Sequence, residues 1–504
     1  MSDVHTSLIA RLRDDLTAAR FTVGHLEELW GVDAAAALGR GHRVAAERAL
    51  GRLGATDPAA TLARVFVLGL TVGPDELAGA LPTLGLEGAI ELGLATAGGA
   101  PMLDLRPYAF TDDWGPAEWW VASDLGELAL GSALPEDHVL GVGGASITLA
   151  GLQVQKSSRR TLDLGTGCGI QAMHASRHSG RVVATDISRR ALEIAALNAE
   201  LNNIHSIEFR LGDMFEPVAG ETFDYIVTNP PFVITPRRPG VPTYEYRDAG
   251  RVGDAIVAEV VAGASRHLAP GGIAQLLGNW EYRDGRPGLE RIASWLDSAE
   301  LDGWVVERET QDPALYAETW IRDGGTRVGA ESDDLENAWL DDFEARGVTA
   351  VGFGYVTLRK PGGGLEAPGT SHLRRLEQLD GPVATGLGAQ IEATLAGHDW
   401  QARRDDAELA RALLTAAPDV TEERHYWPGD EHPAVMNLVQ GGGFRRSYPL
   451  GTALAAVVGA CDGELSVGAI CAAVSELLEV DSAALLDDVL PGIRELVTVG
   501  MLLP

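Results

Sequence analysis

The sequence has few cysteines, almost no lysine and no long apolar run. Its three cysteines, Cys168, Cys461 and Cys471, form no zinc-ligand array, and no other metal-binding cluster is evident. Lys156 and Lys360 are the only lysines, so arginine carries nearly all of the positive charge. No stretch of about twenty uncharged apolar residues is present, and the amino terminus lacks a basic segment followed by an apolar one. We therefore expect a cytoplasmic protein without a metal centre or a membrane span.

The charge of the chain is strongly negative. A formal net charge of −32 at pH 7 argues against a protein that holds nucleic acid by bulk attraction, because phosphate contacts supply most of such binding. Acidic and basic residues nearly balance between residues 151 and 285, whereas acids outnumber bases by more than two to one after Pro361. General solubility can explain such an excess. For the carboxyl-terminal region we expect a contact with protein, because a DNA-reading winged helix would carry basic residues in its recognition helix.

The length predicts several domains. A chain of 504 residues is too long for one ordinary core, and about two to four domains are expected. Residues 1–95 show short helical patterns between Gly and Asp-Pro breaks, which favour a helical, winged-helix-like module. Residues 96–158 then predict a small β-ribbon, a Trp-rich linker over 114–120 and a glycine-bearing stretch over 138–148, which is either a lid or a hairpin loop. A glycine-rich boundary precedes an acidic, winged-helix-like domain over residues 363–504.

The central region, residues 96–362, alternates from about residue 158 between apolar strands and amphipathic helices. This alternation predicts an α/β fold with a seven-stranded, doubly wound, Rossmann-like sheet. The clearest helix runs from Ser188 to Asn202, with Ser188 as its cap. Asp333 to Ala345 predicts an acidic helix whose apolar stripe contacts the core. The expected strands lie near residues 161, 181, 207, 225, 273, 304 and 351.

The stretch Asp224-Tyr-Ile-Val-Thr-Asn229-Pro230-Pro-Phe232 places hydrogen-bond acceptors at the end of a strand. Tyr225 to Thr228 predict a buried parallel strand, which the prolines must end because they lack N–H donors. A residue before proline is held extended, so the Asn229 amide and the Pro230 carbonyl can accept from one incoming amino group. Phe232 adds a flat apolar face. Two acceptors beside a stacking face indicate methyl transfer onto a planar nitrogen; the alternative is a plain Pro-Pro turn.

A glycine loop lies upstream of this stretch. Thr161 to Ile170 predict a short strand, a glycine turn and the start of a helix. Gly165, Gly167 and Gly169 allow positive φ and a close approach of the backbone to a ligand, and the helix amino end offers N–H groups. Asp186, about 20 residues further on, is placed to accept from ribose hydroxyls. The loop and Asp186 fit NAD as well as S-adenosylmethionine.

A third acid separates these two cofactors. Asp213 follows a predicted strand over 207–211, where its carboxylate can accept from an adenine amino group. The order of glycine loop, Asp186, Asp213 and Asn229 is that of a methyl-donor site followed by an acceptor site. Ile187 and Met214 would flank the adenine ring, although each is equally well explained as ordinary core.

Residues 160–280 resemble class I S-adenosylmethionine-dependent methyltransferases of the branch with an Asn-Pro-Pro-aromatic signature. The glycine loop with Asp163, the stretch 184–188, Asn198 and the stretch 212–215 look closest to the release-factor glutamine methyltransferases. Phe232, where those enzymes usually carry Tyr, looks more like the RNA guanine amino methyltransferases. The resemblance implies Asn229, Pro230 and Phe232 as catalytic residues. It implies a donor site formed by Asp163, Gly165, Thr166, Gly167, Gly169, Asp186, Ile187, Asp213, Met214 and Asn229.

The leading hypothesis is an S-adenosylmethionine-dependent methyltransferase that acts on a planar nitrogen of a macromolecule. The loop resemblance and the acidity favour a protein glutamine. RNA guanine or adenine is the alternative acceptor, because Phe232 suits base stacking and a flipped base presents the same amine geometry. A hypothesis of another class is a regulatory module that binds the donor without catalysis. An NAD oxidoreductase is less favoured than any of these.

Overall fold

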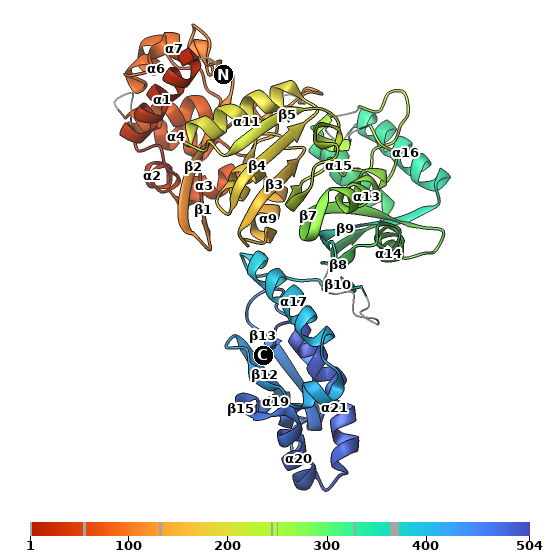
Figure 1. Cartoon of the computed structure of the whole chain (residues 1–504). Coiled ribbons are helices and arrows are strands. Elements are labelled where there is room, and N and C mark those ends of the chain that lie inside the picture. Colours follow the sequence, from red (N-terminus) through yellow and green to blue (C-terminus); the bar gives the residue numbers. More distant parts are fainter. Residues whose placement is uncertain are drawn as a thin grey trace. The chain divides into compact units, whose positions relative to one another are not determined.

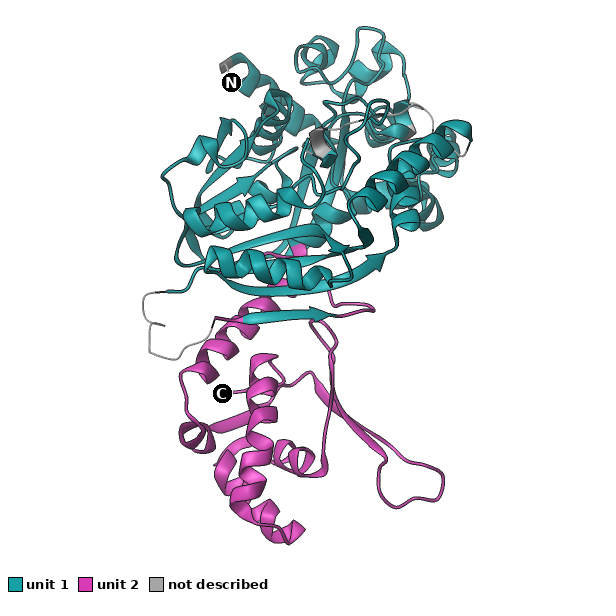
Figure 2. Ribbon diagram, turned by 90° about the vertical axis from the view of Figure 1, so that its right-hand side faces the viewer, with its two compact units in different colours: residues 1–150, 157–362, 374–378 teal, residues 151–156, 363–373, 379–504 magenta. Residues whose placement is uncertain are grey.

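A computed structural model describes residues 3–53, 57–130, 134–242, 245–248, 250–326, 329–362 and 372–504 (Figure 1). The chain forms two units (Figure 2): unit 1 comprises residues 1–150, 157–362 and 374–378, and unit 2 comprises residues 151–156, 363–373 and 379–504. The expected boundary at residue 95 therefore does not separate two units. The expected boundary at residue 362 has two exceptions, because residues 374–378 belong to unit 1 and residues 151–156 belong to unit 2.

Unit 1 is built around an eight-stranded sheet of order β10-β8-β9-β7-β6-β3-β4-β5. Its strands are β3 (Ser158–Leu164), β4 (Ser179–Asp186), β5 (Ile207–Leu211), β6 (Phe223–Thr228), β7 (Leu268–Arg283), β8 (Asp302–Gln311), β9 (Val348–Arg359) and β10 (Arg374–Gln378). Strands β3 to β7 pair in parallel, and β9 lies antiparallel between β7 and β8. All seven expected strands are present, and the α/β fold class is confirmed. The strand count is corrected to eight, because β10 pairs with β8.

The helices of the sheet region are α10 (Ile170–Ser176), α11 (Arg189–Leu201), a 3-10 turn η2 (Glu216–Val218), α12 (Glu245–Asp248), α13 (Ala255–His267), α14 (Gly288–Ala299), α15 (Pro313–Asp323) and α16 (Ala330–Ala345). The Ser188 side chain caps α11 by accepting a hydrogen bond from the backbone N–H of Ala191, as expected. The apolar stripe of α16 is buried, which confirms its contact with the core: Leu335, Trp339 and Phe343.

The strand order reverses at β3, and this reversal places the site. From β3 the chain moves outward to β4 and β5, and it then returns to form β6 on the other side of β3. The loops after β3 and β6 therefore diverge from neighbouring strand ends, and ligands of doubly wound sheets bind at such a switch point.

The segment before the sheet is helical and is followed by a two-stranded ribbon. Its helices are α1 (Asp3–Ala18), α2 (Val23–Trp30), α3 (Val32–Gly39), α4 (Val44–Leu53), α5 (Pro58–Leu62), a π-helical turn η1 (Ala63–Val67), α6 (Pro74–Ala80) and α7 (Gly85–Glu91). The ribbon pairs β1 (Asp104–Asp112) with β2 (Gly115–Ser123), so the expected Trp-rich linker is a strand. After α8 (Glu127–Leu130), the glycine-bearing stretch leads into a helix, α9 (Gly144–Leu152), and not into a hairpin.

One hydrophobic core joins these helices to the sheet region. The cluster that contains Leu12, Leu16 and Phe21 also contains Met173 of α10 and Ile194 of α11. Burial of such side chains is the main favourable term in folding. The amino-terminal helices therefore form one folded body with the helices that follow β3 and β4.

Unit 2 has a core of its own. Its elements are α17 (Leu387–Ala402), α18 (Asp406–Ala410), β11 (Leu413–Ala416), β12 (Val420–His425), β13 (Val435–Gln440), β14 (Ser447–Pro449), α19 (Thr452–Gly459), β15 (Asp462–Ser466), α20 (Val467–Leu478), α21 (Ser482–Thr498) and β16 (Leu502–Leu503). They form two three-stranded sheets, β15-β11-β16 and β12-β13-β14. Val467 of α20, Ile493 of α21 and Met501 lie in the core of this unit.

His174 is buried where the ribbon meets α10. Its Nε2 lies 3.1 Å from the Tyr108 hydroxyl oxygen, and its ring centroid lies 4.4 Å from that of Phe110 and 5.0 Å from that of Trp119. Burial lowers the pKa of His174 to about 3. The folded protein therefore holds this imidazole neutral over a pH range in which the unfolded chain would protonate it.

We expect acid to destabilise unit 1 through His174. Between pH 6.5 and about 3 the unfolded state binds a proton that the folded state does not, so this contribution to stability is complete above pH 6.5 and is lost as the pH falls. At pH 5 the loss is roughly 2 kcal/mol. Replacing His174 by Phe should flatten the pH dependence of unfolding between pH 7.5 and 5. Replacement of the exposed His205 by Phe is the control, and an equal slope in both variants would contradict this assignment.

Candidate active site

The glycine loop follows β3 and leaves open space above its backbone. Gly165 and Gly167 have φ of +71° and +53°, and an added Cβ at either would meet nothing within 4 Å. Gly169 has a different reason: a Cβ there would lie 3.0 Å from the Cβ of Ala195 on α11. Gly165 and Gly167 can therefore let a ligand approach the backbone, whereas Gly169 permits close packing of α11.

Asp163 and Thr166 stabilise the glycine loop through buried hydrogen bonds. Asp163 is fully buried, and its Oδ2 accepts hydrogen bonds from the Thr166 hydroxyl at 2.5 Å and from the Ala172 backbone N–H at 2.9 Å. Its other oxygen, Oδ1, is buried, and no group among the described residues donates to it. Burial raises the pKa of Asp163 to about 7. Asp163 thus supports the loop and also presents a polar atom that no described group satisfies.

Asp186 stands at the end of β4, beside the loop. Its Oδ2 accepts from the backbone N–H of Gly167 at 2.9 Å, and its Oδ1 accepts from that of Ser188 at 2.8 Å. Burial raises its pKa. Each oxygen retains a lone pair that can accept a further hydroxyl. The next side chain, Ile187, is 60 % exposed, so it is not ordinary core.

Asp213 and Met214 follow β5 at the same edge of the sheet. The backbone N–H of Gly212 donates to the Asp186 carbonyl at 3.0 Å, which joins the two acidic turns. Met214 has φ of +46°, a conformation uncommon outside glycine. Asp213 makes an ion pair with Arg251, whose Nη2 lies 3.2 Å from Asp213 Oδ2. Arg251 is not among the expected site residues, because it lies 38 residues from Asp213 and belongs to no recognisable motif.

The Asn-Pro-Pro-Phe turn follows β6, the strand beside β3. The Thr228 hydroxyl donates to the Leu164 carbonyl at 2.7 Å and ties the two strand ends together. Asn229 is half-buried, and its Oδ1 is buried without a hydrogen-bond donor among the described residues. An amide oxygen left unpaired in this way is costly unless a ligand completes it. This atom is the acceptor that the sequence predicts for a substrate amine.

Phe232 differs from the expected open stacking face. Its side chain is only 8 % exposed, and its ring centroid lies 5.7 Å from that of Phe353 and 6.5 Å from that of Trp320. In this structure the ring packs within the protein's own aromatic cluster. Phe232 therefore anchors the turn, and its stacking on a substrate remains a prediction.

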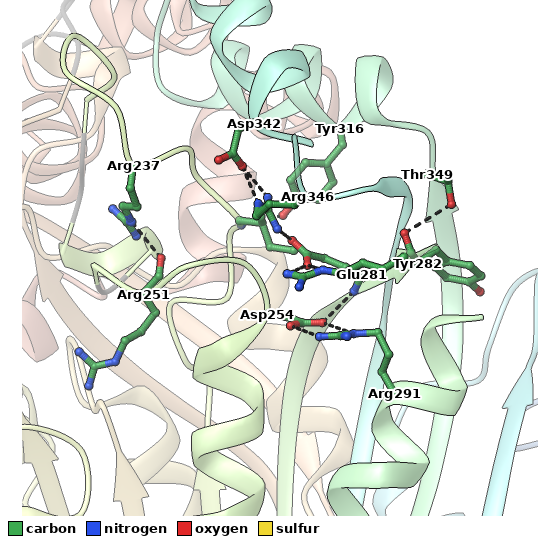
Figure 3. A network of polar contacts seen from close by, with 12 residues as sticks. Arg237, Arg251, Asp254, Glu281, Tyr282, Arg291, Tyr316, Asp342, Arg346 and Thr349 are labelled. Atoms are coloured by element: carbon green, nitrogen blue, oxygen red, sulfur yellow. Dashed lines mark hydrogen bonds and ion pairs between the residues drawn. The ribbon is translucent and has the colours of Figure 1, made fainter. Parts of the chain in front are cut away.

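A network of buried charges supports the segment that follows the turn (Figure 3). Glu281 on β7 is fully buried and pairs with Arg346, at the carboxyl end of α16. Asp254, just before α13, accepts the Glu281 backbone N–H at 3.1 Å and pairs with Arg291 at 2.8 Å. Buried charges are retained when they are paired in this way. The network joins β7 to the starts or ends of three helices around the acceptor side of the site.

Asn198 on α11 connects the donor loop to the ribbon. Its Nδ2 donates to the Cys168 carbonyl at 2.8 Å and to the Ala122 carbonyl at 2.9 Å, and its Oδ1 accepts from the Ala122 N–H at 2.7 Å. Both amide hydrogens and the amide oxygen are thus engaged with backbone groups. Asn198 is therefore a structural residue of the site.

The described part of the chain lacks two further classes of feature. It contains no group of three or more His, Cys, Asp or Glu residues that could hold a metal ion. Within the same residues, no helix has the length and apolarity needed to cross a membrane.

Comparison with known proteins places the chain in a family. A model described as Methyltransferase small domain matches residues 143–286, and two models of domains of unknown function, DUF7059 and DUF7782, match residues 18–106 and 392–504. A Methanocaldococcus jannaschii protein with the provisional name protein N5-glutamine methyltransferase is 32 % identical over 135 residues, which are 26 % of this chain and 68 % of that protein. The chain belongs to the class I S-adenosylmethionine-dependent methyltransferase family.

Two curated bacterial relatives match the same region. The release factor glutamine methyltransferase of Xylella fastidiosa is 38 % identical over 166 residues, or 30 % of this chain and 60 % of that protein. The ribosomal protein uL3 glutamine methyltransferase of Bradyrhizobium diazoefficiens is 32 % identical over 157 residues, or 29 % of this chain and 49 % of that protein. The chain thus spans between about half and 60 % of the length of these two relatives.

Proposed function

We propose that this protein is a methyltransferase that uses S-adenosylmethionine to methylate the side-chain amide nitrogen of a protein glutamine. The observation that carries the proposal is the buried, unpaired Oδ1 of Asn229, set at the switch point beside the open glycine loop. The glutamine-methylating relatives support the choice of acceptor. The ring of Phe232 is buried, so it does not supply the open stacking face that would specifically favour an RNA base.

The residues present fit the donor. Gly165 and Gly167 leave room for its methionine part, and the unpaired Oδ1 of Asp163 lies beneath that loop. Asp186 would take the ribose hydroxyls, and Asp213 would take the adenine amine. The exposed side chain of Ile187 would cover one face of the adenine, and this role would explain why an isoleucine is exposed there. When bound, S-adenosylmethionine supplies an electrophilic methyl group on a positively charged sulfur.

The protein's own contribution to the transfer is orientation. The Oδ1 of Asn229 and the carbonyl oxygen of Pro230 accept hydrogen bonds from the two N–H groups of the glutamine amide. These contacts orient the amide nitrogen toward the methyl group. With the donor bound, the nitrogen would bond to the methyl carbon as the carbon–sulfur bond breaks with its electron pair on sulfur, and the nitrogen would then release one proton to solvent. Correct orientation of reacting groups can contribute about 7–11 kcal/mol in favourable cases. No strong general base is required.

The direct test of the proposal uses methyl-labelled donor and a cell lysate divided into protein and RNA fractions. Label in a protein band, recovered as methylglutamine after digestion, supports the proposed acceptor. Label in RNA alone would establish the alternative acceptor. Binding of the donor without label in either fraction would indicate a regulatory module.

Replacement of Gly167 by Ala tests the donor site. The added methyl group enters the open space above the loop, and the positive φ strains it, so we expect S-adenosylhomocysteine to bind at least tenfold more weakly, or about 1.4 kcal/mol. Gly271 has φ of +78° and equally open surroundings outside the site, and Gly271→Ala is the matched control. Calorimetry decides, and tighter binding of NAD than of S-adenosylhomocysteine by the unaltered protein would exclude the proposed donor.

Asn229 variants separate binding from catalysis. Asn229→Ala should leave donor affinity within a few-fold and lower turnover by at least about a hundredfold, because the lost contact orients the nucleophile. Asn229→Asp keeps an acceptor oxygen, so it should retain more activity than Ala. Wild-type turnover in both variants would show that the Asn-Pro-Pro-Phe motif is only a structural turn.

We also propose that unit 2 contacts a protein through the β12–β13 hairpin. Residues 421–432 are all exposed, and the tip carries Tyr426 and Trp427, which are 50 % and 69 % exposed. A tryptophan left in water at an ordered hairpin is unusual for a surface without a partner. The surrounding charge is acidic, which favours a basic protein segment whose arginines can stack on the two rings: Glu422, Glu423, Asp430 and Glu431.

Replacement of Trp427 by Ala tests this surface. We expect an arginine-rich peptide of about twelve residues to bind the full chain, and the variant to weaken it at least fivefold, or about 1 kcal/mol. Trp114, 55 % exposed in unit 1, provides the control variant Trp114→Ala. Fluorescence anisotropy with the labelled peptide measures both. Tighter binding of an RNA oligonucleotide of equal length would contradict the proposal.

A further inference from the structure

Arg251 connects the acceptor side of the site to the donor side. It lies near the end of the segment between β6 and α13, the segment that begins with Asn229-Pro-Pro-Phe. Its Nη2 lies 3.2 Å from Asp213 Oδ2, and its Nε lies 3.1 Å from each carboxylate oxygen of Glu259 on α13. One guanidinium therefore joins α13 to the turn that follows β5.

The backbone of Arg251 is itself held in place by Arg237 (Figure 3). Arg237 donates from Nε to the Arg251 carbonyl at 2.9 Å, and its Nη2 pairs with Asp248 Oδ1 at 2.7 Å. The Asp248 side chain is almost completely buried. The planar fork of arginine suits two simultaneous contacts of this kind. Arg237 thus cross-links the segment between β6 and α13. It fixes the position of the Arg251 backbone, from which the Arg251 side chain reaches Asp213.

The start of the same segment is also anchored. The backbone N–H of Val233 donates to the Arg247 carbonyl at 2.9 Å, and that of Ile234 donates to the Tyr316 hydroxyl at 3.0 Å. The turn with Asn229 and the arm with Arg251 are therefore two ends of one cross-linked segment. A change at Asp213 can be transmitted to the acceptor turn through these contacts.

The ion pair leaves part of Asp213 available. Arg251 contacts Oδ2, so Oδ1 lies outside this pair. The Asp213 side chain is 43 % exposed, which leaves it accessible to a ligand. A carboxylate held by a guanidinium on one oxygen has a restricted rotamer, and its second oxygen can accept an amine without first losing rotational freedom.

We propose that Arg251 is a positioning residue that orients Asp213 toward the adenine amine of the donor and couples donor binding to the acceptor segment. This inference rests on the proposed function, because it assigns Asp213 to the adenine. Arg251 touches neither the donor nor the acceptor; it acts through Asp213 on the donor and through the cross-linked segment on Asn229.

The test is a double-mutant cycle on the binding of S-adenosylhomocysteine, measured by calorimetry on the full chain. We expect Arg251→Ala to weaken binding by about five- to twentyfold, and Asp213→Ala to weaken it at least as much. The double variant should bind no more weakly than Asp213→Ala alone, since Arg251 has nothing to orient once the carboxylate is removed. Independent, multiplying losses would overturn the proposal.

Controls distinguish this role from a merely structural one. Arg238 lies in the same segment and makes an exposed pair with Asp341 at 2.9 Å, so Arg238→Ala should leave donor affinity within twofold. Arg251→Lys keeps a cation and should recover part of the affinity. Arg251→Ala should also raise the KM of the acceptor more than it lowers kcat. A variant Arg251→Ala that melts earlier but binds S-adenosylhomocysteine as tightly as the unaltered protein would show a structural role only.

Failure of the proposed function gives a different result. If the unaltered protein does not bind S-adenosylhomocysteine, the donor assignment itself is wrong. If it binds and only the coupling between Arg251 and Asp213 is absent, the donor assignment stands and the role of Arg251 is rejected.

Discussion

The fully buried carboxyl group of Asp163 is the constraint on which the donor side of the site depends. By accepting from Thr166 and Ala172, it fixes both the glycine turn and the first turn of α10. Because these buried hydrogen bonds stabilise the loop, the space beside Gly165 and Gly167 can stay open. Burial raises the pKa of this group to about 7, because the charged form loses its hydration in the core. A proton or a ligand can satisfy the oxygen that the protein leaves unpaired.

The two halves of the site meet because β3 and β6 are neighbouring parallel strands. The chain reverses its direction of travel across the sheet between them, so their loops open away from each other and leave a place for a ligand. The contact from Thr228 to the Leu164 carbonyl holds the two strand ends in register. Asn229 then projects from a stiff position, and a rigid acceptor is what orientation of a weakly nucleophilic amide requires.

Arginine provides the positive charge of the ion pairs around the site, because the chain has almost no lysine. Arg237, Arg251 and Arg346 each hold two groups at once, and for Arg251 and Arg346 one of the two is distant in sequence, namely Asp213 and Glu281; two simultaneous contacts suit a planar guanidinium better than a single ammonium group. These contacts surround the segment after β6 and the helices that flank it. The matched methyltransferase domain covers the residues that we propose to bind the donor and the acceptor, whereas residues 18–106 and 392–504 match domains of unknown function. Acceptor choice can therefore depend on parts of the chain outside the matched domain.

Local sequence was sufficient for seven of the eight strands of the sheet and for the motifs. Apolar runs bounded by glycine and proline predicted all seven strands of the core, and the cap at Ser188 predicted the start of α11. These features depend on neighbouring residues, whose preferences are visible in the sequence. From sequence alone the Trp-rich stretch 114–120 resembles a linker, because its strand character comes from pairing with β1 and from the hydrogen bonds between the Trp120 backbone and Asn202. The eighth strand was missed because its partner, β8, lies about 70 residues earlier in the chain.

The candidate site divides in the same way. The sequence alone determined which residue types stand at each strand end: the glycines, Asp186, Asp213 and Asn229. Only the tertiary structure decided which polar atoms are satisfied and which remain open. The unpaired oxygens of Asp163 and Asn229, the burial of Phe232 and the pairing of Arg251 with Asp213 all depend on groups brought together from distant positions. Whether a polar atom finds a hydrogen-bond partner depends on the groups packed around it, and those groups come together only when the chain folds.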